Sequence, residues 1–288
     1  MKKNKTNNEN KLSFAEFKNT IDNLILTKKI SKLKRQENYF DICNNYWIVD
    51  TYIANNGQIN IDATPNTLKS YTACIENNYA ISIPVQILDD GNVVCFSHKN
   101  ISKVVSTASG YLNNLSLEEL KSINLNEDED KVPTLEEALN HIAGRTPIII
   151  EIINEGMIGK LEDKILSLIK NYIEKYDCYN LVAIMSINPY TLQYCFQEFP
   201  YITRILKSGL FTEKTYGTLS TNKLRKLKYY KITNSDFISY SHSLLPYYKI
   251  MTKKPVGIIA NSVTNQNQYI DVAPFCDNII FNSFTPTI

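Results

Sequence analysis

The stretch Tyr79-Ala-Ile-Ser-Ile-Pro-Val-Gln-Ile-Leu-Asp-Asp-Gly-Asn-Val-Val-Cys-Phe-Ser-His98 decides the fold of this chain. Two apolar runs flank Asp90-Gly91, a dipeptide that favours a tight hairpin turn. In the first run, large apolar residues recur at every second position from Ile81 to Val85, which is the period of a β-strand. The second run spans Val93 to Phe96 and ends at a serine and a histidine. We therefore predict a β-hairpin at this place.

Composition narrows the class of protein. The chain has 288 residues, of which 43% are hydrophobic and 21% charged, and this suits one α/β barrel with a large core. A net charge of +2 does not favour nucleic-acid binding. No Cys-x-x-Cys pair occurs among the six cysteines, so we expect buried thiols rather than a zinc or thioredoxin-type site. No secretory signal or membrane-length apolar run is visible, and the cytoplasm is the expected compartment.

Apolar runs and helical patterns alternate along the chain, which predicts β/α units and a parallel sheet. Helices are expected at 66–76, 157–175 and 219–229, and two capping boxes predict helices after Ser116 and Thr134 within a long excursion at 99–146. Nine strands are expected, one more than a closed barrel needs, and the hairpin explains the excess. Besides the two hairpin strands, they are Trp47–Ala54, Pro147–Ile153, Leu181–Ile187, Ile202–Lys207, Phe237–His242, Val256–Ala260 and Ile279–Phe281.

The first 40 residues form a separate region ahead of the barrel, which we assign to residues 41–288. Residues 1–12 are polar and predicted to be disordered. A capping box at Ser13-Phe-Ala-Glu16 opens an amphipathic helix that becomes basic toward residue 36. This helix either packs on the barrel or contacts anionic lipid headgroups, and both alternatives stay open.

Several fragments, in order and with matching spacing, resemble the glycerophosphodiester phosphodiesterase family. The hairpin matches the family's central signature without a gap, and Val132-Pro-Thr-Leu-Glu-Glu-Ala-Leu139 is similar to its Ile-Pro-Thr-Leu-Glu-Glu-Val-Leu. Further fragments are similar at 66–79, 110–120, 186–189, 236–240 and 276–281, so the resemblance covers residues 47 to 286. It implies a TIM-type (β/α)8 barrel of the phosphatidylinositol-phospholipase-C-like kind, with an N-terminal helical extension.

The same resemblance implies a catalytic set that this chain has largely replaced. The family's His-Arg-Gly falls on Asn55-Asn56-Gly57, its Pro-Glu-Asn on Thr64-Pro65-Asn66, and its Glu-x-Asp on Ser82-Ile-Pro84. Its His-Asp falls on Ser97-His98, and in its Glu-x-Lys the glutamate survives as Glu151 while the lysine position is Ile153. Because Mg²⁺ and Ca²⁺ are held mainly by carboxylate oxygens, we expect no metal, with Glu151 as the one retained candidate ligand.

Two histidines are candidate substitutes. His98 is one residue from the expected histidine, and because strand side chains alternate, it should point away from the pocket unless a bulge re-aims it. His242 follows a strand end and either borders the pocket or is a structural histidine. Glu151, if it points inward without a cation, must be hydrogen-bonded or protonated.

These replacements lead to three hypotheses. The first is a non-catalytic family member that serves as a binding or regulatory scaffold for a protein partner or a small polar ligand. Neutral amides and hydroxyls at the rim favour an uncharged ligand over a phosphate; they are Asn55, Asn56, Gln58, Ser82, Ser97 and Asn261. The second is a weak or altered phosphoric diester hydrolase in glycerophospholipid metabolism, which would use Mg²⁺ or Ca²⁺ with Glu151, His98 or His242. The third is an interaction protein that docks through residues 13–36.

Overall fold

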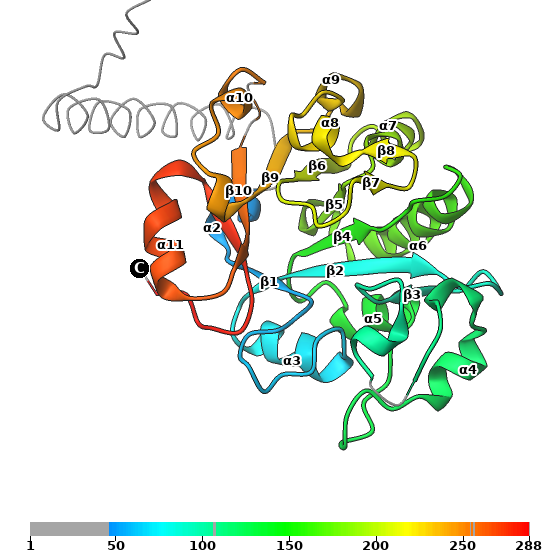
Figure 1. The fold of residues 1–288 in the computed structure, drawn as a ribbon. Helices are drawn as coiled ribbons and strands as arrows, with labels where there is room; N and C mark the ends of the chain where they lie inside the picture. Colours follow the sequence, from blue (N-terminus) through cyan, green and yellow to red (C-terminus); the bar gives the residue numbers. More distant parts are fainter. Residues whose placement is uncertain (1–45, 106–107, 254, 256, 288) are drawn as a thin grey trace, which may run out of the picture.

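Eight parallel strands close into a barrel in the computed structural model, which describes residues 46–105, 108–253, 255 and 257–287. Their order around the barrel is β1-β2-β4-β5-β6-β9-β10-β11, and β11 pairs with β1 to close it (Figure 1). The strands are β1 (Ile53–Asn55), β2 (Ala80–Ile87), β4 (Ile148–Ile152), β5 (Val182–Ser186), β6 (Thr203–Ser208), β9 (Phe237–Ser241), β10 (Gly257–Val263) and β11 (Asn278–Phe281).

Helices cover the outside of this barrel, as the alternating pattern predicts (Figure 1). They are α3 (Leu68–Glu76), α5 (Leu135–Ile142), α6 (Lys160–Tyr176), α7 (Pro189–Glu198), α8 (Thr221–Arg225), α9 (Tyr230–Thr233), α10 (Tyr248–Met251) and α11 (Gln266–Val272). Short 3₁₀ turns stand at Ile101–Lys103, Leu112–Asn114, Tyr179–Leu181, His242–Leu244 and Ala273–Phe275. Apolar side chains fill the space between strands and helices, and the strand residues facing these helices include Ile81, Ile83, Ile150 and Ile184.

The predicted hairpin is present and supplies the ninth strand. β2 pairs in antiparallel fashion with β3 (Val93–Cys95), while its other side pairs in parallel with β4. The turn residue Asp90 accepts a hydrogen bond from the amide of Leu117, at the start of α4 (Leu117–Ser122). Both predicted capping boxes of the excursion form, at Ser116 and Thr134. The hairpin thereby ties the excursion to the barrel wall.

Two predicted elements are wrong. Residues 47–54 are not one strand, because α2 (Trp47–Asp50) precedes a short β1. Trp47 packs with the apolar interior at the amino-terminal end of the strands, and its indole donates a hydrogen bond to the carbonyl of Asn180. The helix places both Trp47 and Ile48 in this apolar cluster.

The expected helix at 219–229 is also broken up. Leu219–Ser220 form β8, which pairs with β7 (Thr215–Tyr216) in a small separate hairpin. α8 then ends at Arg225, and Leu227 has a φ of +54°, a left-handed conformation that interrupts a helix before α9 begins.

Some predictions lie outside the described residues, namely the N-terminal helix at 13–36, Cys43 and Val256. The five described cysteines are free and buried, as expected. Burial raises the pKa of Cys74, Cys95 and Cys195 to about 12, so these thiols are unreactive near neutral pH. None of the described helices has the length and apolar character needed to cross a membrane.

Candidate functional site

The barrel interior changes from apolar to polar along its axis. Near the amino-terminal ends of the strands it is filled by Ile53, Ala80, Ile149, Ala183, Ile205, Phe237 and Ile259. Side chains on a strand alternate between its two faces, so the inward residue of the next layer lies two positions further on. That layer contains Asn55, Ser82, Glu151, Met185, Lys207, Ser239 and Asn261. The polar layer therefore stands at the carboxyl-terminal end of the strands, where (β/α)8 barrels place their sites.

Glu151 and Lys207 form an ion pair across this layer. The Lys207 ammonium nitrogen lies 2.6 Å from Oε1 of Glu151. The Glu151 side chain is 7% exposed and that of Lys207 is 26% exposed, so the carboxylate is buried while the ammonium group borders the opening. β4 carries Glu151 and β6 carries Lys207, with β5 between them. The retained carboxylate is thus neutralised by a side chain of the protein.

Amides and hydroxyls occupy the other side of the layer. Asn261 donates hydrogen bonds to the Ser239 hydroxyl at 3.0 Å and to the Ser208 carbonyl at 3.4 Å. The imidazole Nδ1 of His242 lies 3.2 Å from the carbonyl of Asn261, which holds this half-buried ring against the end of β10. The Ser82 hydroxyl is fully buried and has no hydrogen-bond partner among the described residues. An unpaired buried hydroxyl is unfavourable unless a ligand or water satisfies it.

The β7–β8 hairpin reaches over the mouth from the end of β6. Tyr216 on β7 has a buried hydroxyl, and burial, followed by the charges of Glu155 and Glu151, raises its pKa above the ordinary value. The next residue, Gly217, donates its amide hydrogen to Oε2 of Glu155 at 3.1 Å. A side chain at residue 217 would collide with the Glu155 backbone, because an added Cβ would stand 2.6 Å from the Glu155 carbonyl oxygen. These contacts hold the hairpin against the β4–α6 loop.

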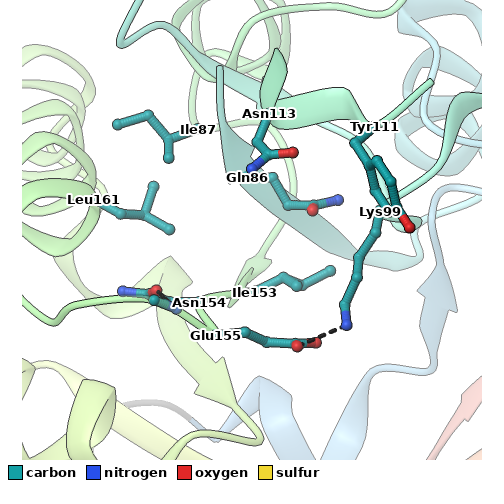
Figure 2. Close-up of a pocket in the computed structure, with 10 residues that line it drawn as sticks. Gln86, Ile87, Lys99, Tyr111, Asn113, Ile153, Asn154, Glu155 and Leu161 are labelled. Atoms are coloured by element: carbon teal, nitrogen blue, oxygen red, sulfur yellow. Dashed lines mark hydrogen bonds and ion pairs between the residues drawn. The ribbon is translucent and has the colours of Figure 1, made fainter. Parts of the chain in front are cut away.

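A pocket of about 410 Å³ opens beside this loop, between the β2–β3 hairpin, the excursion and the start of α6 (Figure 2). Lys99 and Glu155 face each other across it and form an ion pair with 2.6 Å between Nζ and Oε2. Figure 2 shows Tyr111 beside Lys99 on one side and Ile87 and Leu161 on the other. The pocket is therefore polar at one end and apolar at the other.

The structure places the predicted site residues in two groups. Asn55 is half-buried at the end of β1, Ser82 and Pro84 are buried on β2, and Glu151 is buried on β4. Ile153, which the resemblance aligns with the family's lysine, lines the pocket of about 410 Å³, as does Gln86. Asn56 follows Asn55 in a left-handed conformation with a φ of +58°. Its backbone N–H donates a hydrogen bond to the carbonyl of Ser82.

His98 belongs to the second group, on the excursion side. Its ring centroid lies 6.4 Å from that of Phe96, whose side chain packs with Val94 and Leu112 in the small core of the excursion. Burial, followed by the charge of Lys103, lowers the pKa of His98. Half-buried Ser97 follows β3, one residue before His98. The His98 ring therefore lies next to Phe96, a residue of the excursion core.

Sequence reasoning missed four contributors to the site. The sequence marks Lys207 only as the end of a strand. Because side chains on a strand alternate and Ile205 faces the interior, Lys207, two residues further on, faces the interior as well. Tyr216 and Glu155 stand on loops whose positions no local pattern predicts. The Glu162 carboxylate, fully buried at the start of α6, was missed as well; it accepts hydrogen bonds from Asn154, Thr191 and the Gly159 amide and so fixes the loop that carries Glu155.

The residues present do not fit a divalent cation. Mg²⁺ and Ca²⁺ need several oxygen ligands, mainly carboxylates. In the polar layer Glu151 is the single carboxylate, and the Lys207 ammonium group already occupies one of its oxygens. Across residues 46–287 as far as they are described, no group of three or more His, Cys, Asp or Glu side chains is placed to hold a metal ion.

The fold and the sequence agree with one known family. The sequence profile of the glycerophosphoryl diester phosphodiesterase family matches residues 59–258, well over half of the chain. This chain belongs to that family. By its description, the family consists of phosphodiesterases. No curated protein matches the chain.

Solved structures of the family share the barrel. A phosphodiesterase of Oleispira antarctica, in complex with the product sn-glycerol-3-phosphate, is 17% identical, with a TM-score of 0.64 over 83% of this chain and 95% of that one. A glycerophosphodiester phosphodiesterase of Thermotoga maritima is 17% identical, with a TM-score of 0.61 over 81% and 95%. One from Agrobacterium tumefaciens is 15% identical, with a TM-score of 0.60 over 81% and 96%. At these identities the likeness establishes the fold alone.

Proposed function

We propose that this glycerophosphodiester phosphodiesterase-family barrel is a binding or regulatory scaffold that does not hydrolyse phosphodiesters. The ion pair between Glu151 and Lys207 carries this proposal, because it engages the one retained family carboxylate. The family reaction needs a cation at the phosphoryl oxygens, a base for the nucleophile and an acid for the leaving oxygen. The effects of replacing catalytic residues that act together are not additive, and replacing most of such a set removes most of the activity.

The ligand that suits this site is a small, uncharged molecule with several hydroxyl groups. The pair of Glu151 and Lys207 has no net charge, whereas a divalent cation would offer positive charge to a phosphate. The Ser82 hydroxyl has no partner among the described residues, and the Asn55 side chain makes no hydrogen bond with any of them. Neutral donors and acceptors of this kind match ligand hydroxyls. The free thiols of the five described cysteines fit a role in the reducing cytoplasm.

A second candidate is a weak or altered phosphodiesterase. The observation in its favour is the position of His242, whose Nδ1 bonds to the backbone at the barrel mouth and leaves Nε2 for proton transfer. In that case Glu151 would have to leave Lys207 to bind a displaced Mg²⁺ or Ca²⁺.

One assay separates the two candidates. Purified protein is incubated with glycerophosphocholine, with and without Mg²⁺ or Ca²⁺, and released glycerol phosphate is measured. We expect release no faster than in a blank without protein. Metal-dependent release that Glu151→Gln abolishes would overturn the proposal and establish the altered enzyme.

The ligand class is tested by calorimetric titration with glycerol, with myo-inositol and with glycerophosphocholine. We expect a polyol to bind equally well in the presence of EDTA and of Mg²⁺. Binding of glycerophosphocholine that requires Mg²⁺ or Ca²⁺ would refute the neutral-ligand assignment.

A further inference from the structure

Positive charge is concentrated in one segment of the chain. Residues 214–270 contain nine lysines and arginines but one acidic residue, Asp236, although the whole chain has a net charge of only +2. That single acidic side chain lies 3.5 Å from Arg204, with which it pairs. The excess of positive charge in this segment is therefore uncompensated within the segment itself.

The fold gathers these charges on one flank of the barrel. α8 and α9 connect β6 to β9, α10 connects β9 to β10, and the three strands are neighbours in the sheet (Figure 1). Tyr240 joins the two connections, since its hydroxyl donates to the Arg225 carbonyl and its ring stacks on Tyr247 at 5.2 Å. We call this surface the basic flank; its described residues are Lys214, Lys223, Arg225, Lys226, Lys228, Lys231, Lys249 and Lys253.

These cations are available for binding. The six from Lys214 to Lys231 are exposed, and the remaining two are half-buried. Within the described part of the chain, none of the eight makes an ion pair or a side-chain hydrogen bond. Apart from Asp236, which pairs with Arg204, the nearest acidic residues along the chain are Glu213, which adjoins Lys214, and Asp271 on α11. An exposed cluster of like charge without partners repels itself and favours an anionic surface.

Two exposed apolar side chains lie in the same strand connections as these lysines. Tyr248 at the start of α10 is 68% exposed, and the Lys249 ammonium group lies 5.8 Å from the centre of its ring. Leu210, which follows β6, is 59% exposed. A lysine beside an exposed tyrosine, with an exposed leucine in the same β6–β9 connection as the lysines of α8, matches the interface of a bilayer, where cations contact headgroups and apolar groups enter the acyl boundary.

We propose that the basic flank docks this protein on a membrane surface that contains anionic phospholipid. Seven of its eight cations are lysines, which act as point charges and suit a diffuse anionic surface. Recognition of individual phosphates or bases favours the bidentate fork of arginine, of which the flank has one. Most of its residues stand on or beside α8, α9 and α10 and not in the polar layer of the barrel mouth, so the surface can be tested separately from the ligand there.

The test is flotation of the full-length chain with vesicles of phosphatidylcholine, with and without phosphatidylserine. Lys223, Lys226 and Lys228, all exposed, are replaced together by glutamine. Each lysine near an anionic surface changes affinity about five-fold, so we expect roughly 100-fold weaker binding to the anionic vesicles. A matched control replaces the exposed Lys103, Lys160 and Lys170 with glutamine, which removes the same charge elsewhere. We expect the control to bind like the wild type.

Three results would overturn the proposal. They are no binding of the wild type to anionic vesicles, equal binding by the flank variant, and equal losses in flank and control variants. A competition experiment adds double-stranded DNA to the vesicles at the same phosphate concentration. Transfer of the protein from vesicles to DNA would also overturn the proposal and assign the flank to nucleic acid. Circular dichroism of each variant establishes that it is folded.

The apolar contribution has a separate readout. Salt screens the lysines but not apolar insertion. We expect the double variant Leu210→Ser with Tyr248→Ser to bind anionic vesicles roughly 10-fold more weakly, with the loss persisting at high salt. A loss that disappears at high salt would refute insertion of these two side chains.

Discussion

The ammonium nitrogen of Lys207 lies 2.6 Å from Oε1 of Glu151, and this contact joins two strands that are not adjacent in the barrel. A lone carboxylate in this position would be strongly unfavourable. The partner expected for Glu151 from the family pattern is a metal ion, but the partner found is a side chain supplied by β6. The charges of these two side chains therefore compensate each other within the protein.

Removal of Lys207 should destabilise the protein. Lys207→Met leaves the Glu151 carboxylate buried without a partner, and breaking a buried pair in this way costs about 3–5 kcal/mol. Because Lys207 is partly exposed, we expect a smaller loss, about 2 kcal/mol, in the free energy of unfolding measured with urea.

Two controls make that result specific. The double variant Glu151→Gln with Lys207→Met removes both charges and should recover most of the loss. Lys99→Met breaks the pair with Glu155, whose members are 48% and 22% exposed, and should cost less than about 1 kcal/mol. Equal losses for Lys207→Met and Lys99→Met would show that burial does not distinguish the two pairs.

Ser82 and Ser186 should respond oppositely to loss of their hydroxyls. Both are fully buried, but the Ser82 hydroxyl lacks a partner among the described residues, whereas that of Ser186 donates to the Ile152 carbonyl at 2.7 Å. We expect Ser82→Ala to leave the free energy of unfolding unchanged or to raise it, and Ser186→Ala to lower it by about 1–2 kcal/mol. Urea unfolding in the absence of ligand measures both values.

The Ser82 comparison also tests the binding site. If that hydroxyl contacts a ligand, Ser82→Ala should weaken polyol binding although the protein is no less stable. A variant that loses stability but binds normally would place the hydroxyl in the structural framework and not in the site.

Divalent cations should not stabilise the folded state. A ligand present at 100 times its Kd would raise the free energy of unfolding by about 2.7 kcal/mol and the melting temperature by several degrees. Because Glu151 is paired and has no carboxylate neighbour in its layer, we expect Mg²⁺ and Ca²⁺ to leave the melting temperature where EDTA leaves it. A rise that saturates with metal concentration and disappears in Glu151→Gln would contradict this expectation.

The capping box of α5 should make stability depend on acidity. Burial opposes ionisation of Glu137, but Lys121 and the Thr134 amide outweigh it and lower the pKa of this carboxyl below its ordinary value of 4.5. A lowered folded-state pKa stabilises the protein above the unfolded value and loses that effect as pH falls through the folded value. Because the Glu137 side chain is 47% exposed and its charge is screened by solvent, Glu137→Gln should cost less than about 1 kcal/mol at neutral pH.

The acid range provides the check on this prediction. The difference between wild type and Glu137→Gln should shrink as pH falls below 4.5 and vanish once the wild-type carboxyl is protonated. Glu118→Gln is the control, because Glu118 is exposed in the first turn of α4 and takes no part in a capping box. A constant difference across the acid range would mean that the charge of Glu137 is not the cause.

Trp47 gives a direct optical probe of the barrel floor. It is the one tryptophan in the chain and is 8% exposed within the apolar interior layer. Its fluorescence should be blue-shifted in the folded protein and should shift to the red in a single step with loss of circular dichroism. Replacement of Trp47 by phenylalanine should cost less than replacement by alanine, about 3–5 kcal/mol for the latter. A red shift that precedes unfolding of the strands would show that α2 detaches on its own.

Much of the fold could be predicted from the sequence because its patterns are local. The alternation in β2, the turn at Asp90-Gly91 and the boxes at Ser116 and Thr134 each depend on residues a few positions apart. The first strand was misjudged because Trp47 and Ile48 have strand-forming composition, yet their contacts are with Ile53, Ala80 and Phe237 across the barrel floor. Only those distant contacts select a helix there.

The barrel and its hairpin could be predicted from the sequence alone, and so could the buried or half-buried positions of Asn55, Ser82 and Pro84 on β1 and β2. Each of these depends on residue type and spacing along one strand or turn. The partner of Glu151 could not be predicted from local patterns, because Lys207 is 56 residues away and reaches Glu151 through strand order and inward orientation. The basic flank likewise needed the fold, which places α8, α9 and α10 on neighbouring strand connections and so turns dispersed lysines into one surface.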